Sequence, residues 1–277
     1  MRIATNQDSQ EFRVRLASAL VLATVALVAL WLGVVSFALL VTAFCIPMSW
    51  EWGRAVRDDG SDVSLLLHIS AIVLSTLLLL AFGPMAALVV LAAAAAIVFM
   101  LNYGNSGLLS AAGVFYVGLP ALALIWLRQD PQYGVAAVLF VFVVVWSHDT
   151  FAMLCGKSIG GPKLWPSLSP HKTWSGAAGG LLASSAAGGL FALAIPGADP
   201  LYLAINGLVI GAAGLAGDLI ESSFKRAHGL KNASELIPGH GGVLDRLDGI
   251  VIAAVVATVV GLAINFEDPA RALIFWN

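Results

Sequence analysis

Four acidic residues lie near the ends of two long apolar segments in the C-terminal half of the sequence. Asp218 and Glu221 are three positions apart, and Asp245 and Asp248 repeat that spacing. Residues three apart share one face of a helix, so each pair would present its carboxylates together. Such oxygen ligands suit Mg²⁺, which proteins commonly bind through one or two carboxylates and substrate phosphates. The spacing therefore predicts a metal site where the two helix ends meet.

Basic residues are interspersed among these acids, and they suit phosphate groups because they form charge-assisted hydrogen bonds. Gly241 and Gly242 follow His240, and these glycines would let backbone N–H groups approach an anion closely. Carboxylates for a metal beside cations for phosphates indicate phosphoryl or nucleotidyl transfer. The basic residues are Lys225, Arg226, Lys231 and Arg246.

A second polar stretch, residues 147–175, precedes these clusters. It places Asp149 within an apolar segment, where an acid is a functional candidate because burying a carboxylate in lipid is costly. A structural pair with His148 or with a lysine is the alternative. Lys157, Lys163 and Lys172 follow in the same stretch.

Helix capping and membrane topology are the simplest explanation of these charges. Lys225 and Arg226 by themselves would need no further explanation. The four acids on two membrane helices do need one, because a topological signal requires no acids. A transporter whose Asp149 and Asp218 carry protons or cations is a further alternative. It would not need the series of basic residues or the glycine turn, so the sequence favours an enzyme.

The composition indicates an all-α integral membrane protein with many helical spans. Of 277 residues, 60% are apolar and 11% are charged, and the mean hydropathy is +0.92. No strongly basic stretch supports nucleic-acid binding. Cys45 and Cys155 lie within apolar runs and lack metal-ligand spacing, which predicts small packing residues.

A membrane-spanning helix needs about 20 mainly apolar residues, and by this measure the sequence predicts nine spans. Gly33 is the one obvious break in the run from Leu16 to Trp50. With the N-terminus in the cytoplasm, twelve lysines and arginines fall on the cytoplasmic side and only Arg128 and Arg271 on the other. If the first apolar run were a single span, nine lysines and arginines would lie on the cytoplasmic side and five on the other. Either count places the catalytic loops in the cytoplasm. The predicted spans are 16–32, 34–53, 63–81, 83–102, 107–127, 134–155, 174–196, 200–224 and 246–266.

The chain divides into a transmembrane scaffold, residues 1–130, and a transmembrane catalytic region, residues 131–277. In the scaffold, His68 is predicted to be a packing donor between helices, and Glu51, between two tryptophans, an interfacial anchor. In the catalytic region, glycines at helical spacing predict close contact between helices. They are Gly176, Gly179, Gly180, Gly207, Gly211, Gly214 and Gly217.

The segment from Ser222 to Asp248 closely resembles the C-terminal signature of the phosphatidate cytidylyltransferases. It reads Ser-Ser-Phe-Lys-Arg, four further residues, Lys231, and then PGHGGVLDRLD from Pro238 onward. The resemblance covers roughly residues 145–250, because Gly217-Asp218-Leu219, Ser147 with Asp149, and the Ser-Pro-His-Lys-Thr-Trp stretch at 169–174 match as well. Two positions differ: Asn232 stands where the family usually has Asp, and Ser175 where it usually has Glu.

The resemblance implies an enzyme that joins CTP to phosphatidic acid, giving CDP-diacylglycerol and pyrophosphate for phospholipid biosynthesis. It would lie in the cytoplasmic (inner) membrane and use Mg²⁺ held first by Asp218 and Asp245, with Asp248 and Glu221 in support. Lys172 and Arg246 would also be catalytic. The expected substrate-binding residues are Ser169, Thr173, Lys225, Arg226, Lys231, His240, Gly241 and Gly242.

A CTP-dependent polyprenol or dolichol kinase is the nearest alternative, since it would use the same nucleotide but release CDP. The sequence leaves open the acyl-chain preference, the existence of a homodimer, and whether a monovalent cation accompanies Mg²⁺.

Overall fold

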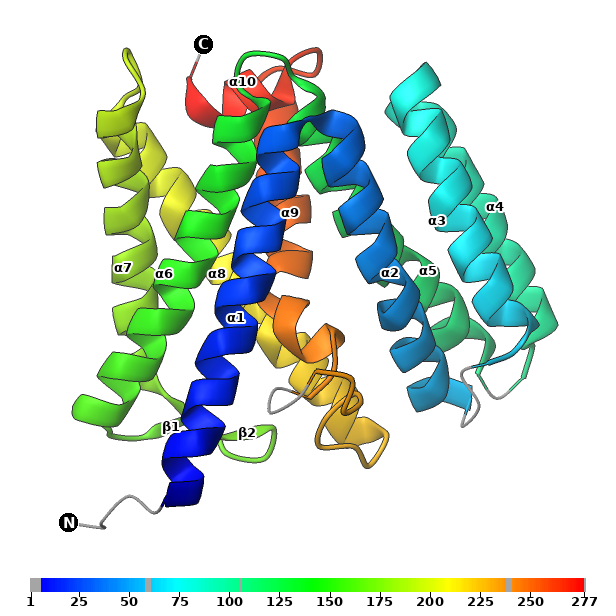
Figure 1. The fold of residues 1–277 in the computed structure, drawn as a ribbon, viewed down its shortest axis with the longest axis horizontal. Helices are drawn as coiled ribbons and strands as arrows, with labels where there is room; N and C mark the ends of the chain where they lie inside the picture. Colours follow the sequence, from blue (N-terminus) through cyan, green and yellow to red (C-terminus); the bar gives the residue numbers. More distant parts are fainter. Residues whose placement is uncertain (1–5, 58–60, 105, 238–240, 277) are drawn as a thin grey trace.

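The computed structural model describes residues 6–57, 61–104, 106–237 and 241–276, with side chains from Ala17 onward. Within these ranges the chain forms nine long helices, a short C-terminal helix and a two-stranded hairpin (Figure 1). The helices are α1 (Asn6–Leu32), α2 (Val34–Arg57), α3 (Val63–Phe82), α4 (Pro84–Leu101), α5 (Gly107–Gln129), α6 (Gly134–Ser158), α7 (Trp174–Phe191), α8 (Pro200–Ala227), α9 (Leu244–Ile264) and α10 (Pro269–Ile274). The other elements are β1 (Lys163–Trp165), β2 (Ser169–Thr173) and a 3-10 turn at Ala192–Ala194.

Eight of the described helices, α2 to α9, are long and apolar enough to cross a membrane. The apolar part of α1, Ala17–Leu32, is shorter. The predicted all-α polytopic fold is therefore confirmed. The helices closely follow the predicted spans, and α1 differs most because it begins at Asn6 instead of near residue 16.

The long apolar run at the N-terminus forms two helices because Gly33 separates them. Its φ of +127° lies in the left-handed region that favours glycine. α1 ends at Leu32 and α2 begins at Val34. The first run is therefore two helices and not one.

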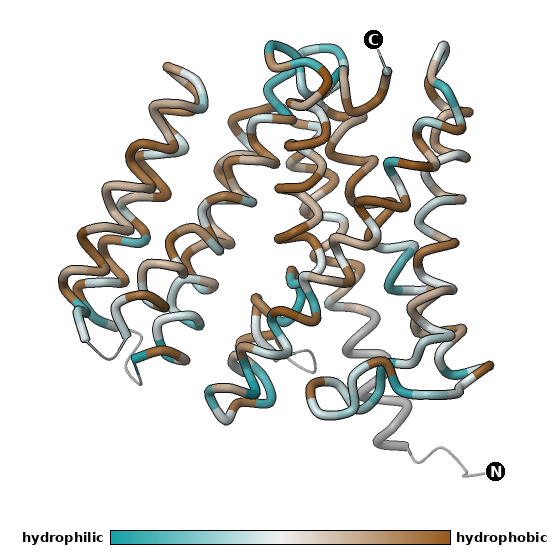
Figure 2. The backbone as a smooth tube through the Cα atoms, turned by 180° about the vertical axis from the view of Figure 1, so that it is seen from behind, coloured by the Kyte–Doolittle hydropathy of each residue, from teal (hydrophilic) through white to brown (hydrophobic). Residues whose placement is uncertain are grey.

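Successive helices run in opposite directions, so their connections alternate between the two ends of the bundle (Figure 1). The beginning of α1, the β1–β2 hairpin and the α8–α9 connection lie at the lower end of the figure, whereas α10 lies at the upper end. Hydrophilic residues gather at the connections, and the middle parts of the helices are mainly hydrophobic (Figure 2). Both polar clusters of the sequence therefore lie at the same end.

The C-terminal helices approach one another closely where glycines face a neighbour. A Cβ added to Gly217 of α8 would lie 2.5 Å from the backbone oxygen of Asp248 on α9. A Cβ added to Gly176 of α7 would lie 2.7 Å from the backbone oxygen of Ala152 on α6. Only glycine leaves room for these approaches, in agreement with the predicted small-residue packing. The first of them brings α8 and α9 together beside the acidic residues.

Residues 163–173, which the sequence indicated only as a loop, form an antiparallel hairpin. Lys163 pairs with Thr173 and Trp165 with Ser169. The strands are too short to give an alternating pattern, and Pro170 and polar residues interrupt the second strand. The hairpin leads directly into α7, so its second strand has a fixed position beside the helix ends.

The predicted packing residues His68, Cys45 and Cys155 all lie in helices and are at least partly buried. His68 is fully buried, and its Nε2 lies 3.2 Å from the backbone oxygen of Ser110 on α5. Cys45 is buried in α2, and Cys155 is partly buried in α6. Neither cysteine forms a disulfide.

Candidate active site

Lys172 of β2 and Asp218 of α8 form an ion pair, although 45 residues lie between them. The Lys172 side chain is about a fifth exposed and the Asp218 side chain about a third, at 21% and 34%. Asp218 also accepts a hydrogen bond from the Ser222 hydroxyl at 3.4 Å. The hairpin and the end of α8 therefore share one site, as the family resemblance implied.

Lys225 lies between the two acidic pairs. Its Nζ donates to Oδ1 of Asp245 at 2.5 Å and forms an ion pair with Oε1 of Glu221 at 3.0 Å. Glu221 is one turn earlier on α8, and Asp245 is in the first turn of α9. The lysine thus joins the end of one helix to the beginning of the next through two carboxylates.

Asp245 also organises the connection between α8 and α9. Its Oδ2 accepts hydrogen bonds from the backbone N–H groups of Ala233 at 2.9 Å and Gly242 at 2.8 Å. Gly241 has a φ of +87°, and a Cβ there would lie 2.9 Å from the same oxygen. The carboxylate therefore already has three donors. Its expected role as a metal ligand stays a prediction.

Glu51 of α2 is a component of the site that sequence reasoning missed. It was predicted to be an interfacial anchor, but it is fully buried. Its Oε1 accepts from Ser234 Oγ at 2.5 Å and Val243 N at 2.9 Å, and its Oε2 accepts from Leu244 N at 2.7 Å. These are the free N–H groups at the beginning of α9, where a negative charge is favourable.

The position of Glu51 in the sequence was the feature that could have indicated its role in the site. It lies within an apolar helix that continues to Arg57, and a charge at such a place needs a partner. The partner could not be identified because it is almost 200 residues away in the sequence. A Cβ on Gly242 would lie 2.5 Å from Glu51 Oε1, so this glycine makes room for the carboxylate.

An aromatic stack supports the same junction. Trp52, the neighbour of Glu51 on α2, stacks on Phe224 of α8 with ring centroids 4.1 Å apart and planes at 10°. Tyr116 of α5 stacks on Trp52 at 4.8 Å. Large apolar rings in contact contribute both burial and ring attraction. The end of α8 is therefore held against α2 and α5.

Asp248 lies one turn after Asp245 on α9, facing α8. It accepts a hydrogen bond from Gly249 N at 2.8 Å, and its backbone oxygen would lie 2.5 Å from a Cβ on Gly217, the residue before Asp218. Glu221 is 2% exposed, and its Oε2 has no hydrogen-bond partner. Asp248 therefore lies close to the end of α8 that carries Asp218 and Glu221.

The remaining predicted residues lie around this centre. Thr173 is buried and caps α7, where its Oγ1 accepts from Gly176 N at 3.1 Å. Asp149 of α6 has a side chain that is 60% exposed and pairs with His148 Nδ1 at 3.1 Å, which was the alternative considered for it. Arg226, Lys231 and Arg246 are exposed, Ser169 is in β2, and His240 lies outside the described residues.

The site offers the oxygen ligands that Mg²⁺ prefers, but its described residues do not arrange enough of them to hold the ion by protein side chains alone. All the acids offer hard oxygen ligands, and Glu221 has a buried oxygen without a hydrogen bond. In the part of the chain that the structure describes, however, no three His, Cys, Asp or Glu side chains are arranged to hold a metal ion. Mg²⁺ usually takes only one or two carboxylates with waters and phosphates, so the site fits a metal shared with substrate.

The charges agree with this interpretation. The four acids outnumber Lys172 and Lys225, the two lysines that pair with three of them. A divalent cation would offset this excess of carboxylates. A phosphate-rich substrate would then meet lysines in place of an acidic surface.

Comparisons with known proteins agree with the resemblance found in the sequence. A protein of Brucella abortus biovar 1 (strain 9-941), named phosphatidate cytidylyltransferase, is 38% identical over 262 residues, which are 94% of this chain and 97% of that protein. A protein of that name from Brucella suis biovar 1 has the same identity and coverage. Another from Bacillus subtilis (strain 168) is 36% identical over 151 residues, 54% of this chain and 56% of that protein.

The profile of the cytidylyltransferase family matches residues 13–263. The matched region includes Glu51, the β1–β2 hairpin and both helix ends with their acidic pairs. This protein therefore belongs to the cytidylyltransferase family.

Proposed function

We propose that this protein joins CTP to phosphatidic acid and produces CDP-diacylglycerol and pyrophosphate, a step of phospholipid biosynthesis. The observation that carries the proposal is the convergence of two lysines and two acidic pairs at one end of α8 and α9. The names of the similar proteins support this pair of substrates.

The reaction asks little of the protein in acid–base chemistry. An oxygen of the lipid phosphate forms a bond to the α-phosphorus of CTP. The bond from that phosphorus to the oxygen bridging to the β-phosphate breaks, and pyrophosphate leaves with the electron pair. The lipid phosphate is ionised near neutral pH, so it needs no general base. Its repulsion by the triphosphate must be overcome, and positioning with electrostatic stabilisation does this.

Lys172 and Lys225 are the cations best placed for this task. Each contacts a carboxylate in the structure, Lys172 on Asp218 and Lys225 on both Glu221 and Asp245. In our proposal their ammonium groups turn from these carboxylates to the phosphates of the bound substrates. Arg246, exposed in the first turn of α9, holds the lipid phosphate on the same side.

We assign Mg²⁺ to Asp218, with Asp248 and Glu221 as supporting acids, and we assign Asp245 to the organisation of the α8–α9 connection. When bound, the metal would screen the negative charge of the phosphates. Asp245 keeps Lys225 and the backbone at Ala233 and Gly242 in place.

We place the active site on the cytoplasmic face of the inner membrane. Lys157, Lys163, Lys172, Lys225 and Arg54 belong to connections or helix ends on the side of the site, and Arg128 belongs to the opposite side. An excess of lysine and arginine marks the cytoplasmic side. CTP would then reach the site from the cytoplasm and phosphatidic acid from the bilayer. A homodimer stays a prediction.

The test is an incubation of the purified protein with phosphatidic acid and CTP labelled at the α-phosphate. Our proposal expects the label in CDP-diacylglycerol and an equal amount of pyrophosphate. Release of labelled CDP would instead indicate a kinase and contradict the proposal. Lys172→Ala should abolish the lipid product, whereas Lys157→Ala, an exposed lysine at the end of α6, is the matched control and should keep it.

A further inference from the structure

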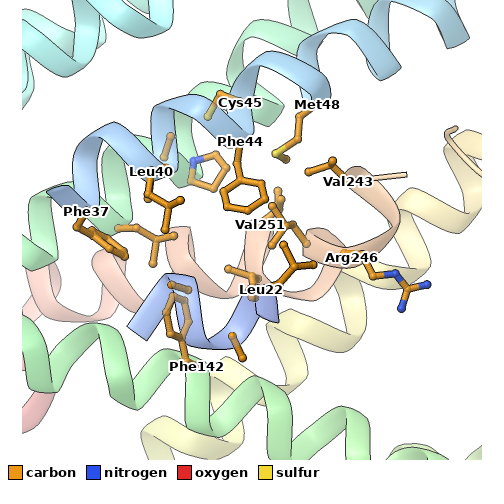
Figure 3. A pocket seen from close by; sticks show the side chains of 18 of the residues that line it. Leu22, Phe37, Leu40, Phe44, Cys45, Met48, Phe142, Val243, Arg246 and Val251 are labelled. Carbon is orange, nitrogen blue, oxygen red and sulfur yellow. The ribbon is translucent and has the colours of Figure 1, made fainter. Parts of the chain in front are cut away.

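A cavity of about 410 Å³ lies between α1, α2, α5, α6 and α9 (Figure 3). Leu22 of α1, Phe44 of α2 and Phe142 of α6 point into it from three sides. Cavities of roughly 300–1,000 Å³ are the usual size of small-molecule sites. This cavity is separate from the carboxylates, none of which lines it.

The lining is apolar apart from one residue. Arg246 is the single charged side chain among the described residues that line the cavity. Figure 3 shows it at the end formed by Val243, with its guanidinium directed away from the apolar lining. A long cationic side chain can contribute its methylenes to an apolar wall while its charge stays in a polar region. The cavity is therefore amphipathic, with its charge at one end.

The length of the cavity is close to the length of a lipid chain. Phe37 and Met48 line it from the same helix, three turns apart on α2, which is about 16 Å at 1.5 Å per residue. The hydrocarbon core of a bilayer is about 30 Å thick, so one leaflet of acyl chains is about 15 Å. Met48 is at the end of the cavity near Val243, and Phe37 is at the far end.

Arg246 connects the cavity with the reaction site. It stands in the first turn of α9 between Asp245 and Asp248, whose carboxylates belong to the acidic clusters. A phosphate bound at Arg246 would be on the same helical turn as the two aspartates. The hydrocarbon attached to that phosphate would have the apolar cavity within reach.

We propose that this cavity receives an acyl chain of the phosphatidic acid substrate, with the phosphate of the same molecule at Arg246. The inference rests on the proposed function and adds the place where the lipid chain binds. α1 forms the outer wall, because Leu22 and Ala23 line the cavity while Val21 and Val25 of the same helix are exposed. The chain is then held between α1 and the remainder of the bundle.

The direct test uses the wild-type protein and a phosphatidic acid that carries a photoreactive diazirine in its acyl chain. After irradiation, mass spectrometry should find adducts on the segments around Leu22 and Phe44. Excess unlabelled phosphatidic acid should remove the adducts, and phosphatidylcholine should not. Adducts only elsewhere, or equal competition by phosphatidylcholine, would overturn the assignment, the second because the cavity would then hold bulk lipid.

The kinetic test fills the cavity from α1. Ala23→Trp places a large ring inside it, and Val25→Trp places the same ring on the exposed face of the same helix, where Val25 is 43% exposed. Ala23→Trp should raise the KM for dioleoyl phosphatidic acid about tenfold, with little change in kcat or in the KM for CTP, because ground-state lipid binding is lost. Val25→Trp should resemble the wild type.

The outcomes separate the two proposals. If the wild-type protein makes no CDP-diacylglycerol, the proposed function fails. If it does and Ala23→Trp behaves as Val25→Trp, the function stands and the cavity assignment fails. If Ala23→Trp does not fold, the photolabelling of the wild type decides the question without it.

Discussion

Lys225 lies between the carboxylates of Glu221 and Asp245, and Lys172 contacts that of Asp218. Each lysine is therefore paired before any substrate arrives. Pairing limits the cost of keeping charges at a membrane boundary, since an isolated buried charge costs several kcal/mol. A substrate phosphate needs only to replace a carboxylate as the partner of a lysine that is already in position.

The acids should differ in their relation to Mg²⁺. We expect Asp218→Asn to lower activity and to raise the Mg²⁺ concentration needed for half-maximal rate. Asp245→Asn should also lower activity, because Lys225 and two backbone N–H groups lose their charged partner, but it should leave the Mg²⁺ dependence unchanged. Mg²⁺ titrations of CDP-diacylglycerol formation by both variants measure this.

The opposite result for the two variants would identify Asp245 as a ligand of Mg²⁺. A shift of the Mg²⁺ dependence in Asp245→Asn, with none in Asp218→Asn, would make Asp245 the ligand, as the family resemblance implied. The conservative change from Asp to Asn keeps the size of the side chain, so both variants should remain folded in detergent.

The contacts between elements explain how distant segments form one site. The β1–β2 hairpin places Lys172 on Asp218, and α2 places Glu51 on the first N–H groups of α9. Local sequence could not reveal either contact. Span lengths and the break at Gly33 depend on neighbouring residues and were predicted correctly, whereas the partner of Glu51 depends on how the helices pack.

A double-mutant cycle tests the contact of the hairpin with α8. Lys172→Ala and Asp218→Ala should each cost on the order of 4 kcal/mol or more in transition-state stabilisation, or about three orders of magnitude in rate. The double variant should lose little more than the worse single variant, because groups that act together are not additive. Measured rates of CDP-diacylglycerol formation that fall additively would mean that the hairpin serves a separate task.

Glu51 should be important for stability as well as for activity. Glu51→Gln keeps the size of the side chain but turns an NH₂ group towards backbone donors, so we expect it to destabilise the protein by about 1–3 kcal/mol. Thermal unfolding in detergent measures the shift. Glu235→Gln, an exposed glutamate in the α8–α9 connection, is the control. Equal melting temperatures for the two variants would contradict the role given to Glu51.

At the scale of the whole molecule, the expected division at residue 130 stays a prediction. The contacts of Glu51 with α9 and of Trp52 with Phe224 cross it, so the N-terminal helices do more than support a separate catalytic part. Composition and span length predicted the architecture because both are properties of single segments. They could not predict a site that takes residues from α2, β2, α8 and α9.

The orientation of the molecule can be measured by cysteine labelling of intact cells. Glu235→Cys and Glu267→Cys replace exposed glutamates at opposite ends of the bundle, in a background without Cys45 and Cys155. An impermeant maleimide added outside should label position 267 and not position 235. The opposite labelling would place the active site outside the cytoplasm.

The burial of Glu51 also has a consequence for the synthesis of the protein. α2 leaves the ribosome long before α9, and until α9 arrives the carboxylate of Glu51 has none of the N–H partners that it finds at Val243 and Leu244. A nascent or truncated chain would thus carry an unsatisfied charge within its second helix, at a cost of several kcal/mol. Insertion of the ninth helix removes that cost. The contact that begins α9 in the finished enzyme would therefore stabilise the chain only once the ninth helix has been inserted.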